Sequence, residues 1–334
     1  MQFGPHLILA LIEGAVLAAV LSLMASGLSL VFGVMRVVNV AHGEFYMLGA
    51  VIAAVISGGI SGVVGTPALG FVAALIMAPL AVGLLAAVAD MTILKRLNYD
   101  PDRTIVATIG LLYILQQGTL MTFGAVARPV EPPFNLRIAL PWVGQTDGGW
   151  GLIWPWGLSV TTYKLFVIAA AIAVITAIRL GLKHSRAGLI MRATQLDRDT
   201  AQAFGIPVGE VNAAVFGLGA GLAALAGVLV VPIQQAHYLM GGDALLLSFI
   251  VVIIGGLGSL IGAFFGAALL HLVPIFLKFG LPGLGVPIGG ATAEHLTHIL
   301  TGALIIFVLI VEPHGLARLW ATAKQKLRLW PFPH

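Results

Sequence analysis

The stretch Gly27–Ala50, GLSLVFGVMRVVNVAHGEFYMLGA, decides how the rest of the chain is interpreted. It lies inside a long apolar region, yet it carries four polar side chains within nine positions: Arg36, Asn39, His42 and Glu44. A charged side chain at membrane depth costs about 2.5–3.5 kcal/mol on insertion scales, so such groups usually face a bundle interior or a pathway. We call these nine residues the polar island. The island either lines a substrate or ion path, or joins two helix ends with Glu44 paired to Arg36.

The composition is that of an integral membrane protein. Of the 334 residues, 59% are hydrophobic and only 9% are charged, whereas soluble domains carry about 25% charged residues. The 42 glycines and the many aliphatic residues favour packed membrane helices over a barrel of alternating strands. The formal net charge of +4 is attributed to basic cytoplasmic loops rather than to nucleic-acid binding. The absence of cysteine excludes disulfide and zinc–thiolate chemistry.

Apolar runs of about 20 residues are long enough to cross the bilayer as helices. Their number predicts an all-α, polytopic bundle of about eight or nine transmembrane helices that includes broken or re-entrant elements. Residues 245–277 are too long for one span and short for two, so we expect two short helices that meet at a glycine break. The other spans are expected at residues 7–34, 37–57, 68–94, 104–126, 163–180, 212–232 and 296–311.

The distribution of Lys and Arg predicts the sidedness of the loops. The positive-inside rule places loop 181–211 and the tail 313–334 in the cytoplasm. The proline-rich loop 128–162 and the Gly/Pro-rich loop 278–295 are then external. We expect residues 1–334 to form a single transmembrane domain.

The cytoplasmic loop 181–211 has the pattern of a short amphipathic helix. Ser185 is a suitable N-cap, and Gly205 followed by Pro207 is a stop signal. Apolar side chains recur between these positions at helical spacing. The expected apolar face consists of Leu189, Ala193, Leu196, Thr200 and Phe204. Such a helix either lies on lipid headgroups or docks into a groove on another protein.

A series of glycines in the second half of the chain indicates close helix packing. Small residues let helix backbones approach each other in lipid. The glycines expected in such contacts are Gly217, Gly221, Gly258, Gly262 and Gly266. The run GLGAG is not a dinucleotide fingerprint, because no strand precedes it.

The sequence contains no motif for covalent or hydrolytic chemistry. It has neither the GxxxxGK[ST] phosphate loop nor the HExxH zinc motif. His295 and His298, with Glu294, are interpreted as a wet interfacial group rather than as a metal site. We therefore expect no metal, no cofactor in this chain, and no enzyme activity.

Four segments resemble, in the same order, the LivH-type permeases of branched-chain amino acid ABC importers. The first is the opening stretch, and the others are HSRAGLIMRATQLDRDTAQAFGIPVGEVNAAVFGLGAGLAALAGVL (184–229), IGGLGSLIGAFFGAALL (254–270) and LIVEPHGLA (309–317). The resemblance implies a multi-pass permease of the bacterial inner membrane. Its implied partners are a second homologous permease, two ABC ATPase subunits that bind the ATP, a periplasmic binding protein and the lipid bilayer.

The resemblance also implies roles for two groups of residues. It matches residues 186–205 to the loop that docks on the ATPase, and it matches the polar island to the central helix break. The implied docking positions are Arg186, Gly188, Arg192, Ala193, Asp197 and Gly205. The implied substrate-path candidates are Asn39, His42, Gly43 and Glu44.

The function implied by the resemblance is ATP-driven import of branched-chain or related amino acids by alternating access. Permeases similar to this sequence also carry urea, short amides or aromatic acids, so those solutes stay open. Two other classes compete with an importer subunit. One is a stand-alone secondary transporter, which would need its own coupling-ion site, and the other is a membrane enzyme built around His42 and Glu44.

Overall fold

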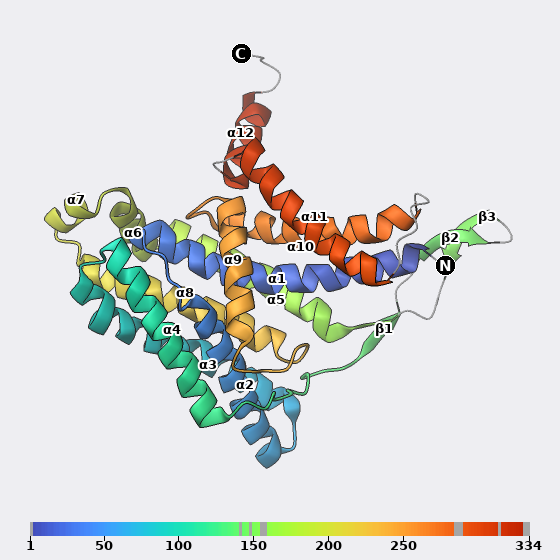
Figure 1. Ribbon diagram of the computed structural model, residues 1–334, viewed down its shortest axis with the longest axis horizontal. Coiled ribbons are helices and arrows are strands. Elements are labelled where there is room, and N and C mark those ends of the chain that lie inside the picture. Colours follow the sequence, from blue (N-terminus) through green and yellow to red (C-terminus); the bar gives the residue numbers. More distant parts are fainter. Residues whose placement is uncertain are drawn as a thin grey trace.

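The computed structural model is a bundle of long helices (Figure 1). It describes residues 3–139, 142–146, 149–153, 159–283, 290–312 and 315–329. The helices are α1 Phe3–Met35, α2 His42–Val64, α3 Pro67–Ala89, α4 Pro101–Phe123, α5 Thr162–His184, α6 Arg186–Leu196, α7 Arg198–Ala203, α8 Val208–Val230, α9 Met240–Gly255, α10 Leu260–Gly283, α11 Gly290–Val311 and α12 Leu316–Leu329. A π-helical turn at Asp90–Leu94 and a 3-10 turn at Lys95–Leu97 extend α3.

The two ends of the bundle differ in structure. The short helices α6 and α7 lie at one end of the long axis, and the N-terminus lies at the other end beside the strands (Figure 1). Helix α1 runs between the two ends. It packs against α5, α8, α9 and α10 along its length.

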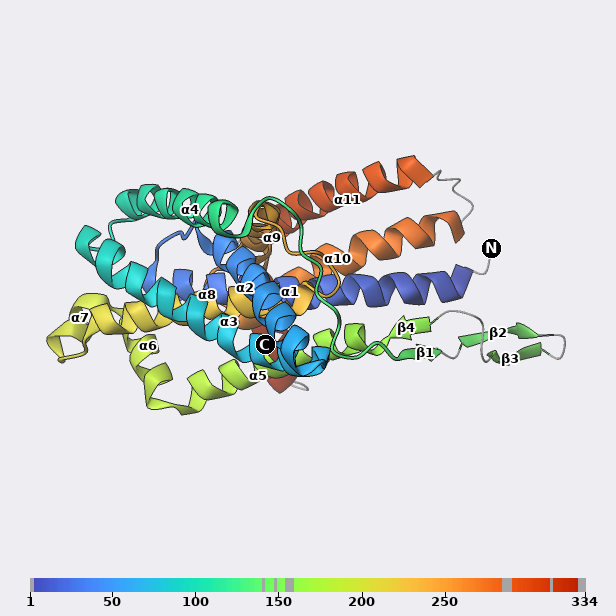
Figure 2. The same cartoon turned by 90° about the horizontal axis from the view of Figure 1, so that it is seen from below.

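The loop at residues 128–162 corrects the expectation of an all-α chain. It contains β1 Arg137–Ala139, β2 Trp142–Thr146, β3 Gly149–Ile153 and β4 Ser159–Thr161. Strand β1 pairs with β4 and β2 pairs with β3, both antiparallel, and Figure 2 shows β2 and β3 extending beyond the helices. Prolines oppose helix formation here, and pairing lets the extended backbone satisfy its own hydrogen bonds. Residues 140–141, 147–148 and 154–158 of the loop lie outside the described residues.

The expected count of eight or nine spans is not confirmed. Among the described residues, six helices are long and apolar enough to cross a membrane: α1, α2, α3 with its extension, α4, α5 and α8. Helices α9 and α10 form a seventh candidate as one bent pair. The described apolar part of α11, Ile299–Val311, is shorter than a span. The number of spans expected from the sequence was higher because the bent pair was treated as two elements and the last apolar run as a full span.

The glycine break between α9 and α10 is where the sequence predicted it. The two helix axes differ by 116°, and Gly256 and Gly258 have φ values of 98° and 80°. Residues with side chains rarely adopt this left-handed region, which explains the glycines at the turn. The pair begins at Met240, five residues earlier than expected.

The expected loop at residues 278–295 is largely wrong. Helix α10 continues to Gly283, and α11 begins at Gly290. Residues 284–289 lie outside the described part of the chain. Local Gly and Pro content indicated a loop, but the flanking apolar helices extend into the region from both sides.

Helix α8 lies at the centre of the bundle, in contact with α1, α2 and α3. Glycines allow these backbones to approach. A Cβ atom built on Gly219 would lie 2.8 Å from the Gly27 carbonyl oxygen of α1, and one on Gly217 would lie 2.8 Å from that of Gly83 in α3. A Cβ on Gly49 of α2 would overlap the backbone of Ala224.

The glycines named from the sequence all lie at contacts with other segments. A Cβ on Gly221 would lie 3.3 Å from the Pro79 carbonyl oxygen. One on Gly266 would lie 2.8 Å from the Val251 carbonyl oxygen, and one on Gly262 would overlap the Gly255 carbonyl. Gly258 approaches Gly33 of α1 in the same way.

Replacing Gly49 by Ala should destabilise the protein by about 1–3 kcal/mol, because the added methyl group would overpack the contact between α2 and α8. The measurement is thermal unfolding of the purified chain in detergent. Unfolding is monitored as the loss of the monodisperse peak in size-exclusion chromatography after heating. The matched control is Gly59→Ala in the same helix, where a Cβ has no neighbour within 4 Å. The control should be neutral or slightly stabilising, since Ala favours helix. Equal unfolding temperatures for the two variants would contradict the packing role of Gly49.

Candidate functional site

The polar island forms the break between α1 and α2. Helix α1 ends at Met35, and Arg36 adopts a left-handed φ of 56°, which turns the chain away from the α1 axis. The side chain of Asn39 then accepts a hydrogen bond from the Ala41 backbone N–H at 3.1 Å. Helix α2 begins one residue later, at His42.

The substrate-path candidates lie inside the bundle. Asn39, His42 and Glu44 have exposed fractions of 1% or less, and Gly43 is buried as well. The Nε2 atom of His42 lies 3.0 Å from the Met24 carbonyl oxygen of α1. Glu44 and Gly43 face α9 at Gly241, where a Cβ would lie 2.7 Å from the Gly43 carbonyl oxygen.

Several polar atoms of the island are buried without a partner. Within the described part of the chain, Nδ2 of Asn39, Nδ1 of His42 and Oε2 of Glu44 make no hydrogen bond. A buried polar group without a partner costs about 1–3 kcal/mol. Such groups in native structures call for a functional or structural explanation.

Of the two alternatives for the polar island, the pairing of Glu44 with Arg36 does not occur in the structure. Glu44 is buried, whereas Arg36 is exposed and points toward α6. The Arg36 guanidinium donates a hydrogen bond to the Gln195 carbonyl oxygen at 3.1 Å. A second bond fixes the island to α4, because the Val40 N–H donates to Oγ1 of Thr108 at 3.2 Å. The island is thus a junction between elements that are distant in sequence.

The expected single amphipathic helix is two helices, α6 and α7. Ser185 caps α6 as predicted, since its Oγ accepts from the Gly188 N–H at 3.1 Å. Asp197 interrupts the helix and caps α7, accepting from the N–H groups of Asp199 at 3.0 Å and Thr200 at 3.2 Å. A hydrogen bond from the Thr200 hydroxyl, together with these backbone hydrogen bonds, holds the pKa of the exposed Asp197 carboxyl below its usual value.

The docking candidates divide into exposed and supporting positions. Arg186, Asp197 and Gly205 are exposed. Gly188 is buried where α6 turns back on α5, and a Cβ there would overlap the Leu182 backbone. The guanidinium of Arg192 donates to the Leu182 carbonyl oxygen in the last turn of α5, where carbonyl groups lack helical partners. Ala193 is half-buried.

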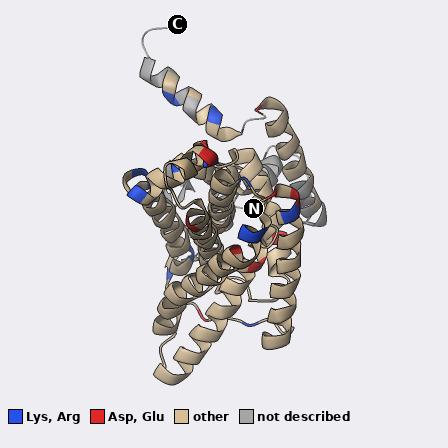
Figure 3. Ribbon diagram, turned by 90° about the vertical axis from the view of Figure 1, so that its left-hand side faces the viewer, with Lys and Arg blue, Asp and Glu red and all other residues tan. Residues whose placement is uncertain are grey.

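Three large apolar side chains of α6 and of the residue that follows α7 are exposed. Leu189, Leu196 and Phe204 have exposed fractions of 62%, 82% and 83%. Figure 3 views the molecule from this end, where charged residues colour the nearest loops and helix ends while the helices behind are mostly tan. Apolar side chains exposed among charged groups are typical of an interaction surface.

A polar cluster that the sequence analysis missed attaches α7 to the end of α3. The Tyr99 hydroxyl donates to the Asp90 carboxylate at 3.1 Å, and the Arg198 guanidinium lies 4.6 Å from the centre of the Tyr99 ring. Burial, together with the negative charge of Asp90, raises the pKa of Tyr99 to about 12. Asp90 and Tyr99 lie nine residues apart, but Arg198 is distant from both in the sequence, so only the fold brings it to them.

Two adjoining cavities lie between α1, α5, α6 and the α9–α10 break. Their volumes are about 400 and 630 Å³. The described residues that line them include Arg36, Arg179, Lys183 and Arg192 but no Asp or Glu. A cleft lined by one sign of charge concentrates ions of the opposite sign, so this region favours anionic groups.

The chain is similar to a known family of transport proteins over most of its length. The family described as "Branched-chain amino acid transport system / permease component" matches residues 10–309. The chain is 27% identical over 317 residues to the high-affinity branched-chain amino acid transport system permease protein LivH of Escherichia coli (strain K12), covering 91% of this chain and 93% of LivH. It is 24% identical over 320 residues to BraD of Pseudomonas aeruginosa, a permease of the same description, covering 93% of this chain and 95% of BraD.

The chain also has a weaker similarity to a solved structure. The structure described as "PsaBC from Streptococcus pneumoniae in complex with Fab" is 13% identical and covers 93% of this chain and 94% of its own, with a TM-score of 0.41. That score is too low to transfer details of helix packing. The family match spans both helix breaks, the α6–α7 pair and the central helix α8. The chain is therefore a multi-pass protein of the inner membrane and belongs to the permease family of branched-chain amino acid transport systems.

Proposed function

We propose that this chain is the membrane-spanning permease subunit of an ATP-binding-cassette importer. It translocates branched-chain amino acids that a periplasmic binding protein delivers. A second, homologous permease completes the path, and two separate ATPase subunits supply the energy. In this arrangement α6 and α7 face the cytoplasm, and the strands β1 to β4 face the periplasm.

The observation that carries the proposal is the contact of α6 with both helix breaks. The Gln195 carbonyl oxygen of α6 accepts the hydrogen bond from Arg36 in the α1–α2 break. A Cβ on Gly258, in the α9–α10 break, would lie 3.5 Å from Nε2 of Gln195 and 3.1 Å from the Cα atom of Gly33. A displacement of α6 would therefore act on both breaks at once.

The breaks are suitable parts for alternating access. Discontinuous helices in transporters place irregular backbone where it lines a cavity, and they let one part of a bundle move against another. Closure of the ATPase pair would move α6 and α7, and the island would follow through Arg36. The unpartnered atoms of His42 and Glu44 would find partners, or contact the solute, in another conformation of the path.

The cation-lined cavities support a solute that carries a carboxylate, as branched-chain amino acids do. Arg36, Lys183 and Arg192 provide positive charge, and a carboxylate is the group that such a site attracts. Urea and short amides carry no carboxylate, so the site gives them no comparable attraction. Aromatic acids do carry one and remain the alternative within the family. A stand-alone secondary transporter is the alternative outside it.

The direct test is co-purification of the tagged chain with a second permease, ATPase subunits and binding protein expressed from neighbouring genes. ATP hydrolysis by the complex should rise when the binding protein is loaded with Leu, Ile or Val. The chain purified by itself should hydrolyse no ATP. If it instead transports solute by itself in liposomes, the importer proposal fails and a coupling-ion site must be sought at His42 and Glu44.

Replacing Leu196 or Phe204 by Asp should weaken association with the ATPase at least about tenfold, since truncating an apolar anchor and adding a charge removes a contact of hot-spot size. Both side chains are more than 80% exposed, so the unfolding temperature of the permease should not change. The measurement is the amount of ATPase subunit that co-purifies with each tagged variant.

Gln202→Asp is the matched control for this prediction. It adds the same charge to an exposed position of α7 without removing an apolar side chain. It should retain ATPase association. Unchanged co-purification of Leu196→Asp and Phe204→Asp would show that this face rests on lipid headgroups instead.

Replacing Glu44 by Gln should reduce the rate of solute uptake by about tenfold while the fold is retained. The substitution keeps the size of the side chain but removes a buried carboxyl whose Oε2 atom has no partner. A tenfold change corresponds to about 1.4 kcal/mol, which is the size of one altered interaction. The measurement is ATP-dependent uptake by the full complex in proteoliposomes.

Glu13→Gln provides the comparison. Glu13 is a partly exposed carboxylate of α1 that pairs with Lys164 near the strand end of the bundle, where an ion pair contributes little. Uptake should be nearly normal in this variant. Wild-type uptake kinetics for Glu44→Gln would remove Glu44 from the path.

A further inference from the structure

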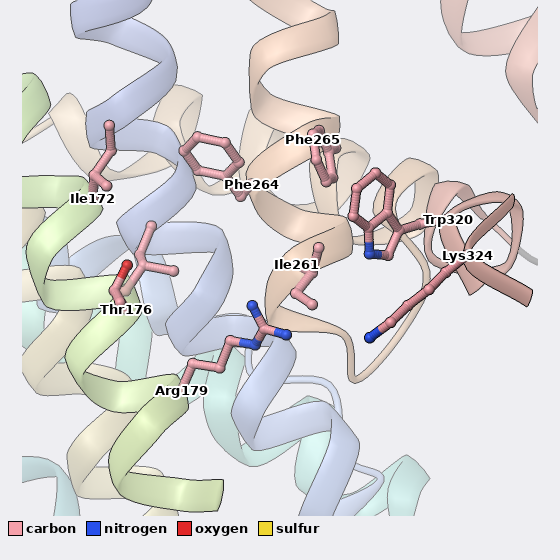
Figure 4. A pocket seen from close by; sticks show the side chains of 9 residues that line it. Ile172, Thr176, Arg179, Ile261, Phe264, Phe265, Trp320 and Lys324 are labelled. Atoms are coloured by element: carbon pink, nitrogen blue, oxygen red, sulfur yellow. The ribbon is translucent and has the colours of Figure 1, made fainter. Parts of the chain in front are cut away.

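An apolar groove lies between α5 and α10, and α12 closes one side of it (Figure 4). Its volume is about 420 Å³, within the range of roughly 300–1,000 Å³ that is usual for ligand sites. The walls are mainly apolar and come from three helices. They include Ile172 and Ile175 of α5, Phe264 and Phe265 of α10, and Trp320 of α12.

Two cations reach the same region of the groove from opposite walls. In Figure 4 the guanidinium of Arg179 and the ammonium group of Lys324 extend toward each other past Ile261. Both side chains are exposed, and the described residues that line the groove include no Asp or Glu. The groove therefore combines a long apolar surface with a local positive charge.

The position of Arg179 along α5 is compatible with the headgroup region. Arg179 lies five residues before the end of α5 at His184, which is about 7.5 Å along the helix axis. Basic side chains near the end of a membrane helix extend toward the interface. The Trp320 ring centre lies 5.4 Å from that of Phe265 with the planes tilted by 39°, and tryptophan is a residue type that is enriched at that level.

We propose that the groove binds an anionic glycerophospholipid. The phosphate lies between Arg179 and Lys324, and one acyl chain extends along the Ile172 and Phe264 walls past Trp320. By the sidedness proposed for α6, this is the cytoplasmic leaflet, which carries the anionic lipids that attract basic groups.

A phospholipid fits the groove better than the other occupants do. It brings one anion and one apolar chain on the same molecule, which matches two cations at the mouth of an apolar surface. A second protein would have to bring carboxylates into this apolar surface, at the cost of their desolvation. Free phosphate would use the cations but leave the aromatic walls without a partner.

The test uses lipids brominated on their acyl chains, which quench nearby tryptophan fluorescence. The full-length chain is reconstituted in phosphatidylcholine vesicles that contain brominated phosphatidylglycerol or, at the same molar share, brominated phosphatidylcholine. The chain has six tryptophans, so the Trp320 signal is taken as the difference between the wild type and Trp320→Phe. Brominated phosphatidylglycerol should quench this signal at a lower molar share than brominated phosphatidylcholine does.

Substitution of the cations should remove the lipid preference. Arg179→Gln and Lys324→Gln should each reduce the preference for phosphatidylglycerol by about fivefold, and the double variant should show none. Lys183→Gln is the matched control, since it removes a cation from the same helix that does not line this groove. It should retain the preference.

Competition in the wild-type chain tests the proposal without any substitution. Unlabelled phosphatidylglycerol should restore the Trp320 signal, whereas inorganic phosphate should not. Equal quenching by the two brominated lipids, or displacement by phosphate, would overturn the proposal. Absence of Trp320 quenching in the complex with a second permease would show that protein covers the groove, and would overturn it as well.

Discussion

Backbone contact at glycine is the constraint on which the rest of this structure depends. In lipid, apolar side chains gain little by leaving one apolar environment for another, so helices associate through close packing. Helix α8 approaches α1 at Gly219 and Gly27, α3 at Gly217 and Gly83, and α2 at Gly49. Larger residues at these positions would separate the helices and open the centre of the bundle.

This close packing explains how the protein accommodates its polar island. The island is irregular backbone with buried polar side chains, which lipid does not tolerate. Because α1, α4, α6 and α9 surround it, its backbone and side chains meet protein on several sides. The buried polar atoms that still lack a hydrogen bond destabilise the fold, and the surrounding packing offsets this loss of free energy. Such an arrangement is common at functional sites.

The contacts of α6 give the fold a route from one end of the bundle to its interior. Helix α6 is held to α5 by Arg192 and to the α1–α2 break by Arg36, while α7 is held to the end of α3 by Arg198 and Tyr99. The pair is therefore attached to the bundle at several points, although its outer face is exposed. An attached pair with an exposed apolar face is suited to transmit a displacement from a bound partner.

Local signals in the sequence predicted the parts of the structure that depend on neighbouring residues. The Ser185 cap and the glycine break after α9 are examples, because a capping side chain and a left-handed turn act within a few residues. Asp197 was not recognised as a cap, since an Asp between two helical stretches is also compatible with one continuous helix. The strands of the 128–162 loop were missed because their pairing joins residues up to 24 positions apart, such as Arg137 and Thr161.

The sequence by itself determined that the chain is a helical membrane protein with a polar break after α1. The length of an apolar run, and polar residues that interrupt it, are visible in the order of the residues alone. Only the tertiary structure decided which partners those residues have. It turned Arg36 toward Gln195 instead of Glu44, and it brought Arg179 and Lys324 to one groove from positions 145 residues apart. These pairings depend on how helices pack, and packing is set by contacts between residues that the sequence does not place side by side.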